Sequence, residues 1–94
     1  MAHWSLEFSE TAENDLAKLD HPVRRRILAK LGWFAAHFDV VIPQTLGGDF
    51  GDFYKLRVGD WRILYTADPT TSTIILRMID RRDKIYERRS PLTK

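Results

Sequence analysis

Residues 54–65, YKLRVGDWRILY, contain the clearest fold signal in the chain. Gly59 and Asp60 separate two runs that alternate apolar and polar side chains, and a two-residue connection of this kind is typical of a β-hairpin. Because successive side chains of a strand point to opposite faces, one face is predicted to be apolar and the other cationic. The apolar face would hold Tyr54, Leu56, Val58, Trp61, Ile63 and Tyr65, and the opposite face Lys55, Arg57 and Arg62.

Two helices are predicted before the hairpin. Residues 3–8 alternate as a strand, and Ser9 is placed to cap a helix that runs to about Leu19. Pro22 marks the start of a second helix, and because almost no residues separate the two, an antiparallel helical hairpin is expected. The apolar stripe of the second helix is Val23, Ile27, Leu31, Phe34 and Phe38, whereas Arg24, Arg25 and Arg26 are predicted to lie on its solvated side.

The rest of the chain reads as a loop followed by strands. Pro43 and the Gly47–Gly48 pair indicate a loop over about residues 39–51. Strands are expected over 52–58, 61–67 and 73–80, and the last of them would place Ile74, Leu76 and Met78 on the apolar face, opposite Ile75, Arg77 and Ile79. The order β-α-α-β-β-β predicts an α+β fold, in which an N-terminal strand and a helical hairpin pack on a curved, mainly antiparallel sheet. Residues 1–94 are expected to form a single domain.

Composition narrows the classes of function. The chain has 94 residues, of which 44% are hydrophobic and 30% charged, as is ordinary for a folded soluble domain. It contains no cysteine, which excludes disulfides and thiolate chemistry. Its three histidines lack metal-ligand spacing, so neither a metal site nor a cofactor is expected. No signal peptide or membrane span is recognisable, and a cytoplasmic location is expected.

Positive charge is concentrated in the second half of the chain. Residues 1–54 carry a net charge of −3 and residues 55–94 a net charge of +5, which is a common footprint of nucleic-acid binding. Arg77 is a further candidate for the cationic face. The segment DRRDKIYERR, residues 80–89, adds Arg81, Arg82, Lys84 and Tyr86. Arginine suits phosphate, and tyrosine can stack on a base or move a proton; surface ion pairing of Arg81 and a packing role for Tyr86 are the alternatives.

Four segments together resemble the RelE/ParE superfamily of type II toxins, from about Trp4 to Arg88. They are FSETAENDLAKLD, PVRRRILAKL, LGGDFGDFYKLRVGDWRILYTAD and MIDRRDKIYER. The specific parts are the block YKLRVGDWRILY and the ending I-D-x-R-x-x-x-Y-x-R. The resemblance implies a RelE-like fold and a ribosome-dependent endoribonuclease that cuts mRNA in the ribosomal A site by attack of the 2′-OH on the adjacent phosphate, without a metal.

Residue roles follow from the same resemblance. Lys55, Arg57, Arg62, Arg82 and Tyr86 match the catalytic positions of RelE-like toxins, and Arg77, Arg81 and Lys84 would add RNA contacts. Two positions depart from the family pattern: Arg57 stands where a second lysine is frequent, and Arg81 where many relatives have histidine. Since arginine is a poor proton carrier, proton transfer is assigned to Lys55 or Tyr86.

Partners and rival functions also follow from the resemblance. The expected partners are the ribosome with its mRNA and a RelB-like antitoxin, which would wrap the domain and bury or displace the tail near Tyr86. One alternative is the ParE branch, which poisons DNA gyrase and generally lacks the Arg-plus-Tyr ending. The other is a non-catalytic RNA-binding protein.

Overall fold

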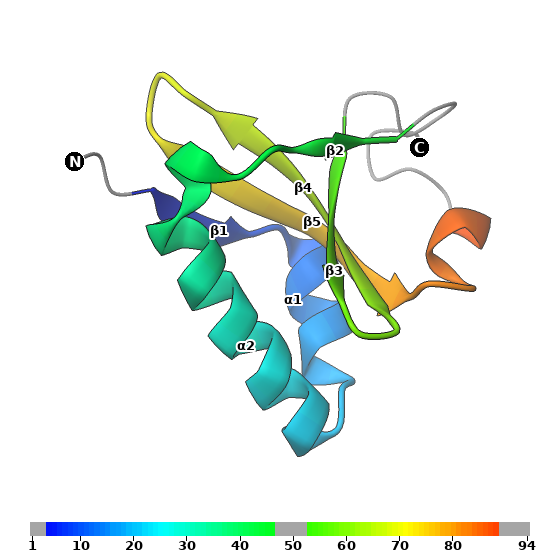
Figure 1. The fold of residues 1–94 in the computed structure, drawn as a ribbon. Coiled ribbons are helices and arrows are strands. Elements are labelled where there is room, and N and C mark those ends of the chain that lie inside the picture. The colour runs from blue at the N-terminus through cyan, green and yellow to red at the C-terminus, as the bar shows by residue number, and fades with distance from the viewer. Residues whose placement is uncertain (1–3, 47–52, 89–94) are drawn as a thin grey trace.

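The computed structural model describes residues 4–46 and 53–88. The elements in order are β1 (Ser5–Phe8), α1 (Glu10–Ala17), α2 (His21–Ala36), the short 3-10 helix η1 (Phe38–Val40), β2 (Gln44–Thr45), β3 (Tyr54–Val58), β4 (Trp61–Asp68), β5 (Thr73–Arg81) and the 3-10 helix η3 (Ile85–Glu87). The strands form one sheet in the order β1-β5-β4-β3-β2, as Figure 1 shows. Only β1 and β5 pair in parallel among these strands, so the predicted α+β fold with a mainly antiparallel sheet is confirmed.

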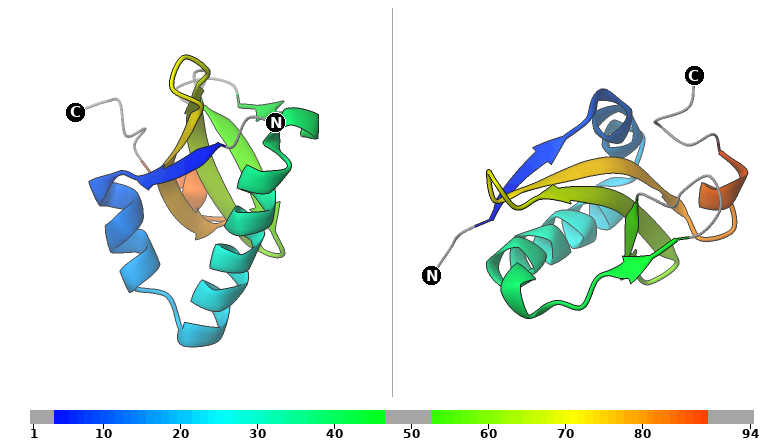
Figure 2. Two further views of the ribbon diagram at one scale, coloured as in Figure 1. Left: turned by 90° about the vertical axis from the view of Figure 1, so that its left-hand side faces the viewer. Right: turned by 90° about the horizontal axis from the view of Figure 1, so that it is seen from above.

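The two helices lie on one side of the sheet and diverge from their short connection as a V (Figures 1 and 2). The hydroxyl Oγ of Ser9 accepts a hydrogen bond from the backbone amide of Ala12 at 3.1 Å, which confirms the predicted cap of α1. The apolar stripe of α2 packs on the sheet, where it completes the main core. The buried members of this core are Ala12, Ile27, Leu31, Phe34, Val58, Ile63, Tyr65, Ile74, Leu76 and Ile79.

Arg24 belongs to the folded framework and not to a solvated surface, so that prediction was wrong for this residue. Its Nε donates to the carbonyl of Leu16 at 3.2 Å, and its Nη2 donates to those of Ala17 and Leu19 at 3.1 and 3.0 Å. The last carbonyls of a helix have no partner within the helix. Arg24 therefore caps the end of α1 and ties α2 to it. The two arginines that follow it are exposed, as predicted.

The predicted loop after α2 contains two short elements that the sequence reading missed. Phe38 lies in η1 instead of α2, with its ring edge-on to Phe34 at a centroid distance of 5.1 Å. The strand β2 pairs with the first residues of β3, and Pro43 precedes it. Residues 47–51 of the predicted loop lie outside the described residues.

A β-bulge in β5 changes which side chains face the helices. Leu64 pairs with Met78, but the next residue, Tyr65, pairs with Leu76, so that β5 carries one extra residue at this point. The alternation is therefore shifted: Ile79 lies in the core and Met78 on the opposite side of the sheet. The sequence-based assignment of Met78 to the apolar face and Ile79 to the other face was wrong for this reason.

The burial of Tyr65 predicts an alkaline limit to stability. Burial, together with the nearby Tyr54, raises the pKa of the Tyr65 hydroxyl from 10.0 to about 12. Because the folded-state pKa is raised, the contribution to stability is complete below pH 10 and is lost as the pH rises through 12. Urea unfolding between about pH 9.5 and 12 should therefore show roughly 2 kcal/mol more loss of unfolding free energy for wild type than for Tyr65→Phe. Equal losses in the two proteins would contradict this assignment.

Candidate functional site

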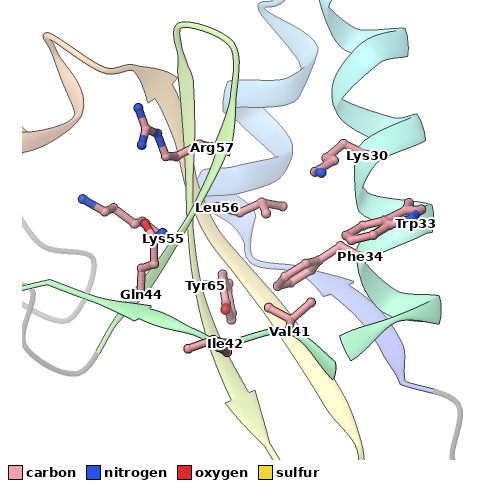
Figure 3. Close-up of a pocket in the computed structure, with 10 residues that line it drawn as sticks. All are labelled: Lys30, Trp33, Phe34, Val41, Ile42, Gln44, Lys55, Leu56, Arg57 and Tyr65. Atoms are coloured by element: carbon pink, nitrogen blue, oxygen red, sulfur yellow. The ribbon is translucent and has the colours of Figure 1, made fainter. Parts of the chain in front are cut away.

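The β3–β4 hairpin places three cations on the sheet face that points away from the helices, hereafter the outer face. Figure 3 shows Lys55 and Arg57 on one side of β3, whereas Leu56 between them points toward α2. Arg57 pairs directly with Arg62 of β4, and Arg62 pairs with Asp80 of β5. A row of charged residues therefore runs across three neighbouring strands near the hairpin turn.

The two arginines of this row differ in what they can do. Arg57 and Arg62 carry like charges directly opposite each other, an arrangement that by itself destabilises a sheet. Arg62 is only 7% exposed, and its Nη1 donates to the carbonyls of Gly59 and Trp61 at 2.9 Å each. The side chain of Arg57 is exposed, and it makes no hydrogen bond or ion pair with any other residue that the structure describes. Arg62 therefore braces the turn and adds positive potential, while Arg57 can receive an incoming anion.

A second charged group, the Arg88 clasp, joins the tail to α1 and β5. Nη1 of Arg88 donates to Oδ2 of Asp15 at 3.0 Å and to Oδ2 of Asp80 at 3.2 Å. The buried Asp15 also accepts the Ile79 amide at 2.9 Å. Burial opposes the charge of Arg88, but its hydrogen bonds to the two carboxylates and their charges outweigh this effect and raise its pKa. Asp80 is therefore ion-paired with Arg88, although its register partner in β4 is Arg62.

An apolar cluster on the outer face holds the tail against the sheet. Ile85 of η3 is fully buried with Phe53, Leu64 and Met78. Leu64 pairs directly with Lys55. The cluster therefore brings η3, and with it the 46% exposed Tyr86, to the same face as the cations of β3.

The other tail residues are divided between the two faces. The amide of Arg82 donates to the carbonyl of Asp60 at 2.8 Å, which fixes this exposed arginine beside the hairpin turn. Arg81 pairs with Trp61 and its guanidinium lies 5.6 Å from the centre of that ring, toward the helix side of the sheet. Lys84 is exposed and precedes η3. The structure thus brings the backbone of Arg82 to the hairpin turn, where Arg81 and Arg82 line one hollow with Asp60 and Asp83.

Arg77 occupies the bulge and lies away from the hairpin turn. Its Nε donates to Oγ1 of Thr66 at 3.1 Å, and the side chain is half-buried. Thr66 follows Arg62 by four residues along β4, which corresponds to about 13 Å of extended strand. Arg77 is therefore separated from the row formed by Arg57 and Arg62.

Three parts of this site were not foreseen from the sequence: Asp15, the pairing of Arg88, and the apolar cluster. Ile85 was the available signal for the cluster, because it is the one aliphatic residue in the otherwise polar or aromatic run 80–89. No local pattern marks Asp15, since it meets Arg88 across 73 positions of sequence.

The arrangement suits binding of a phosphate and transfer of protons. Exposed arginines can bind phosphate oxygens through two parallel hydrogen bonds. Lys55 and Tyr86 carry protons that can be exchanged, whereas the arginines stay charged. Within residues 4–46 and 53–88, no group of three histidine, aspartate or glutamate residues could hold a metal ion. Over the same part of the chain no helix is both long and apolar enough to span a membrane.

Known proteins share both the sequence pattern and this fold. A family model described as "ParE toxin of type II toxin-antitoxin system, parDE" matches residues 6–85. Toxin RelG of Mycobacterium tuberculosis (strain ATCC 25618 / H37Rv) is 29% identical over 89 residues, which cover 90% of this chain and 98% of RelG.

Two solved structures extend the comparison. The toxin–antitoxin complex RelBE2 of Mycobacterium tuberculosis superposes with a TM-score of 0.65 at 27% identity, covering 86% of this chain and 93% of that one. The isolated RelE toxin of E. coli gives a TM-score of 0.67 at 21% identity, with coverages of 85% and 84%. The second likeness bears on the fold alone.

Proposed function

This chain belongs to the ParE toxin family of type II toxin–antitoxin systems, within the RelE/ParE superfamily, and from that premise we propose that it is a metal-independent endoribonuclease that cleaves mRNA in the ribosomal A site. The membership confirms the resemblance inferred from the sequence. The observation that carries the proposal is the outer face itself. There the exposed Arg57 lies opposite Arg62, and a tail anchored by Ile85 brings Tyr86 to the same side of the sheet.

The proposed reaction needs only groups that this face offers. The 2′-OH attacks the adjacent phosphorus, the P–O5′ bond breaks, and the products are a 2′,3′-cyclic phosphate and a 5′-OH. Arg57 and Arg82 would hold the phosphate oxygens, and the field of Arg62 would favour the added negative charge. Lys55 and Tyr86 would accept and donate the two protons. Arg77, Arg81 and Lys84 remain proposed RNA contacts outside this centre.

Mapping of mRNA ends in cells tests the function directly. The protein would be induced in a bacterial host, and mRNA 5′ ends would be sequenced and aligned with the reading frames. Ribosome-dependent cleavage predicts new 5′-OH ends within translated regions, with a three-nucleotide periodicity. Growth arrest without such ends would contradict the proposal.

Phosphate contacts predict a salt-dependent affinity for RNA. If about three exposed cations each neutralise one phosphate, the slope of log K against log salt is about −2 for a single strand. Affinity for a labelled 2′-deoxy-modified RNA should then fall roughly 15-fold between 50 and 200 mM salt, measured by fluorescence anisotropy. Arg57→Ala should make the slope shallower by about 0.7, whereas the exposed α2 variant Arg25→Ala should leave it unchanged. A flat response in wild type would count against phosphate-led binding.

An antitoxin is the proposed protein partner. The related RelBE2 structure is that of a toxin–antitoxin complex, and this chain's family is named for the toxin of such a system. We therefore propose a RelB-like antitoxin, with the ribosome and its mRNA as the targets of the toxin in its absence. A cytoplasmic site of action follows from this proposal.

Inhibition of DNA gyrase is the second candidate, because the matching family model is that of ParE. A supercoiling assay with purified gyrase separates the two functions. Inhibition of supercoiling together with intact mRNA would establish the ParE-like function. RNA binding without either effect would instead identify a non-catalytic RNA-binding protein.

A further inference from the structure

Two arginines from different elements meet the β3–β4 turn at Gly59. Nη1 of Arg62, in β4, donates to the carbonyl of Gly59 at 2.9 Å. Nη2 of Arg26, in α2, lies 2.8 Å from the position that a Cβ atom on Gly59 would occupy. Glycine suits this position for two reasons: its φ of +58° is rare for other residues, and a side chain here would displace the guanidinium. The turn therefore supports the side chain of Arg26.

Arg26 brings an accessible charge to this turn, whereas Arg62 is buried there. The side chain of Arg26 is exposed, and it makes no hydrogen bond or ion pair with any residue that the structure describes. Asp60 is the acidic residue of the turn, but both ion pairs found within residues 4–46 and 53–88 belong to Arg88. Arg26 is therefore open to an anion from outside the chain.

The edge of β3 beside the turn connects the outer face with Arg26. Figure 3 shows Arg57 on the side of β3 away from α2, and Arg57 precedes Gly59 by two residues, which correspond to about 7 Å of strand. β2 pairs only with Tyr54 and Lys55 of β3, so no described strand covers this edge beside Arg57. A flexible polyanion that contacts Arg57 can therefore cross the edge near the turn and reach Arg26.

The chemistry of these positions favours the phosphates of a continuous strand. A guanidinium binds two phosphate oxygens through parallel hydrogen bonds. Contact with Gly59 restricts the Arg26 side chain before a ligand arrives, which lowers the entropic cost of binding. A line of cations is the footprint of a nucleic-acid backbone, and Arg26 continues the line that Lys55 and Arg57 form on the outer face. RNA therefore fits this arrangement better than an isolated carboxylate does.

We propose that Arg26 binds a phosphate of the mRNA strand outside the scissile bond, where the strand leaves the outer face over the edge of β3. That the ligand is mRNA rests on the proposed function. Arg26 touches no reacting atom and is a binding residue, so its contribution is to the affinity for RNA. The RNA footprint of the protein then extends from the outer face around the β3–β4 turn to α2.

Two adjacent arginines of α2 provide a matched test in the full-length protein. Arg26→Ala and Arg25→Ala remove the same charge, but the Arg25 side chain hydrogen-bonds to His21 and not to the turn. The probe is a labelled 2′-deoxy-modified RNA of about ten nucleotides, and its binding is measured by fluorescence anisotropy. Arg26→Ala should weaken binding about fivefold at about 0.1 M salt and make the slope of log K against log salt shallower by about 0.7. Arg25→Ala should stay within about twofold of wild type, and so should Arg26→Lys, because lysine also binds phosphate.

A shorter RNA shows where along the strand the contact lies. A labelled, 2′-deoxy-modified RNA of about three nucleotides ends before the edge of β3 when its phosphates occupy the outer face, so Arg26→Ala should bind it as wild type does. Equal losses of affinity for the two RNAs would overturn the proposal, because Arg26 would then act at the scissile phosphate or on the fold of the turn.

The remaining outcomes separate this contact from the proposed function. Equal losses in Arg25→Ala and Arg26→Ala would overturn the contact in favour of net charge. Wild-type affinity of Arg26→Ala for the longer RNA, with weaker binding to ribosomes that carry no mRNA, would also overturn it and assign Arg26 to the ribosome. If wild type cleaves no mRNA but Arg26→Ala alone loses affinity for the longer RNA, the contact stands and the endoribonuclease assignment fails.

Discussion

Under the proposed endoribonuclease function, an Arg57→Ala variant is expected to cleave mRNA at least about 100-fold more slowly than wild type, the size of effect seen when one preorganised donor to a developing charge is removed. Arg57 is exposed and has no partner among the described residues, so its removal leaves no group of the fold unsatisfied. Single-turnover cleavage of a reporter mRNA on purified ribosomes measures the effect. The melting temperature should stay within about 2 °C of wild type, because exposed substitutions rarely change stability by more than about 0.5 kcal/mol.

Arg25→Ala is the matched control for charge. It removes one exposed arginine from α2, where the Arg25 side chain hydrogen-bonds only to His21 among the described residues, and the cleavage rate of this variant should stay within about twofold of wild type. Equal losses in Arg25→Ala and Arg57→Ala would show that net charge alone matters. Arg62 is a poorer choice for this test, because its loss would also remove the hydrogen bonds that it donates to the carbonyls of Gly59 and Trp61.

An Asp15→Ala variant is expected to lose about 2–4 kcal/mol of unfolding free energy. The change leaves the buried Ile79 amide without its acceptor and removes one of the two carboxylates of Arg88, and both losses are costly in a buried site. Asp15→Asn keeps an acceptor for the amide and loses only the charge, so its loss should be about 1 kcal/mol smaller. Urea denaturation near neutral pH measures both values.

Asp39→Ala supplies the control for the clasp. Asp39 is exposed and accepts the indole N–H of Trp4 at 2.9 Å, so its loss should cost about 1 kcal/mol or less. Because Arg88 ties the tail that carries Tyr86, Asp15→Ala should also slow mRNA cleavage under conditions where it remains folded. A stability equal to that of Asp39→Ala would show that the clasp contributes nothing beyond a surface interaction.

The features that the sequence predicted correctly are those encoded by short-range pattern. Alternation in residues 54–65 and the Gly59–Asp60 connection predicted both the hairpin and the side of β3 on which Lys55 and Arg57 lie. The cap at Ser9 was predicted equally well, as was the stripe of α2 from Val23 to Phe34, whereas Phe38 lies in η1. In each case the physical cause operates within a few residues along the chain, so the feature can be predicted from the amino-acid sequence alone.

The features that escaped prediction depend on contacts between distant segments. The faces of Met78 and Ile79 follow from the pairing of β4 with β5, which alternation within β5 does not contain. Arg62 has the same residue type as Arg57, yet its neighbours at the turn bury it. The capping role of Arg24 arises from a neighbouring helix. Charge at these positions could be predicted, but whether that charge is available to a ligand could not.

The extra residue in β5 means that this strand changes phase midway, and the two phases serve different purposes. Before the bulge, Ile74 and Leu76 lie in the core; after it, Met78 on the outer face packs against the tail residue Ile85. Deletion of Arg77 would remove the bulge and restore regular alternation along β5, so that Met78 would turn toward the helices and Ile79 away from them. One residue therefore separates a strand that only builds a core from a strand that also carries the tail of the candidate active site.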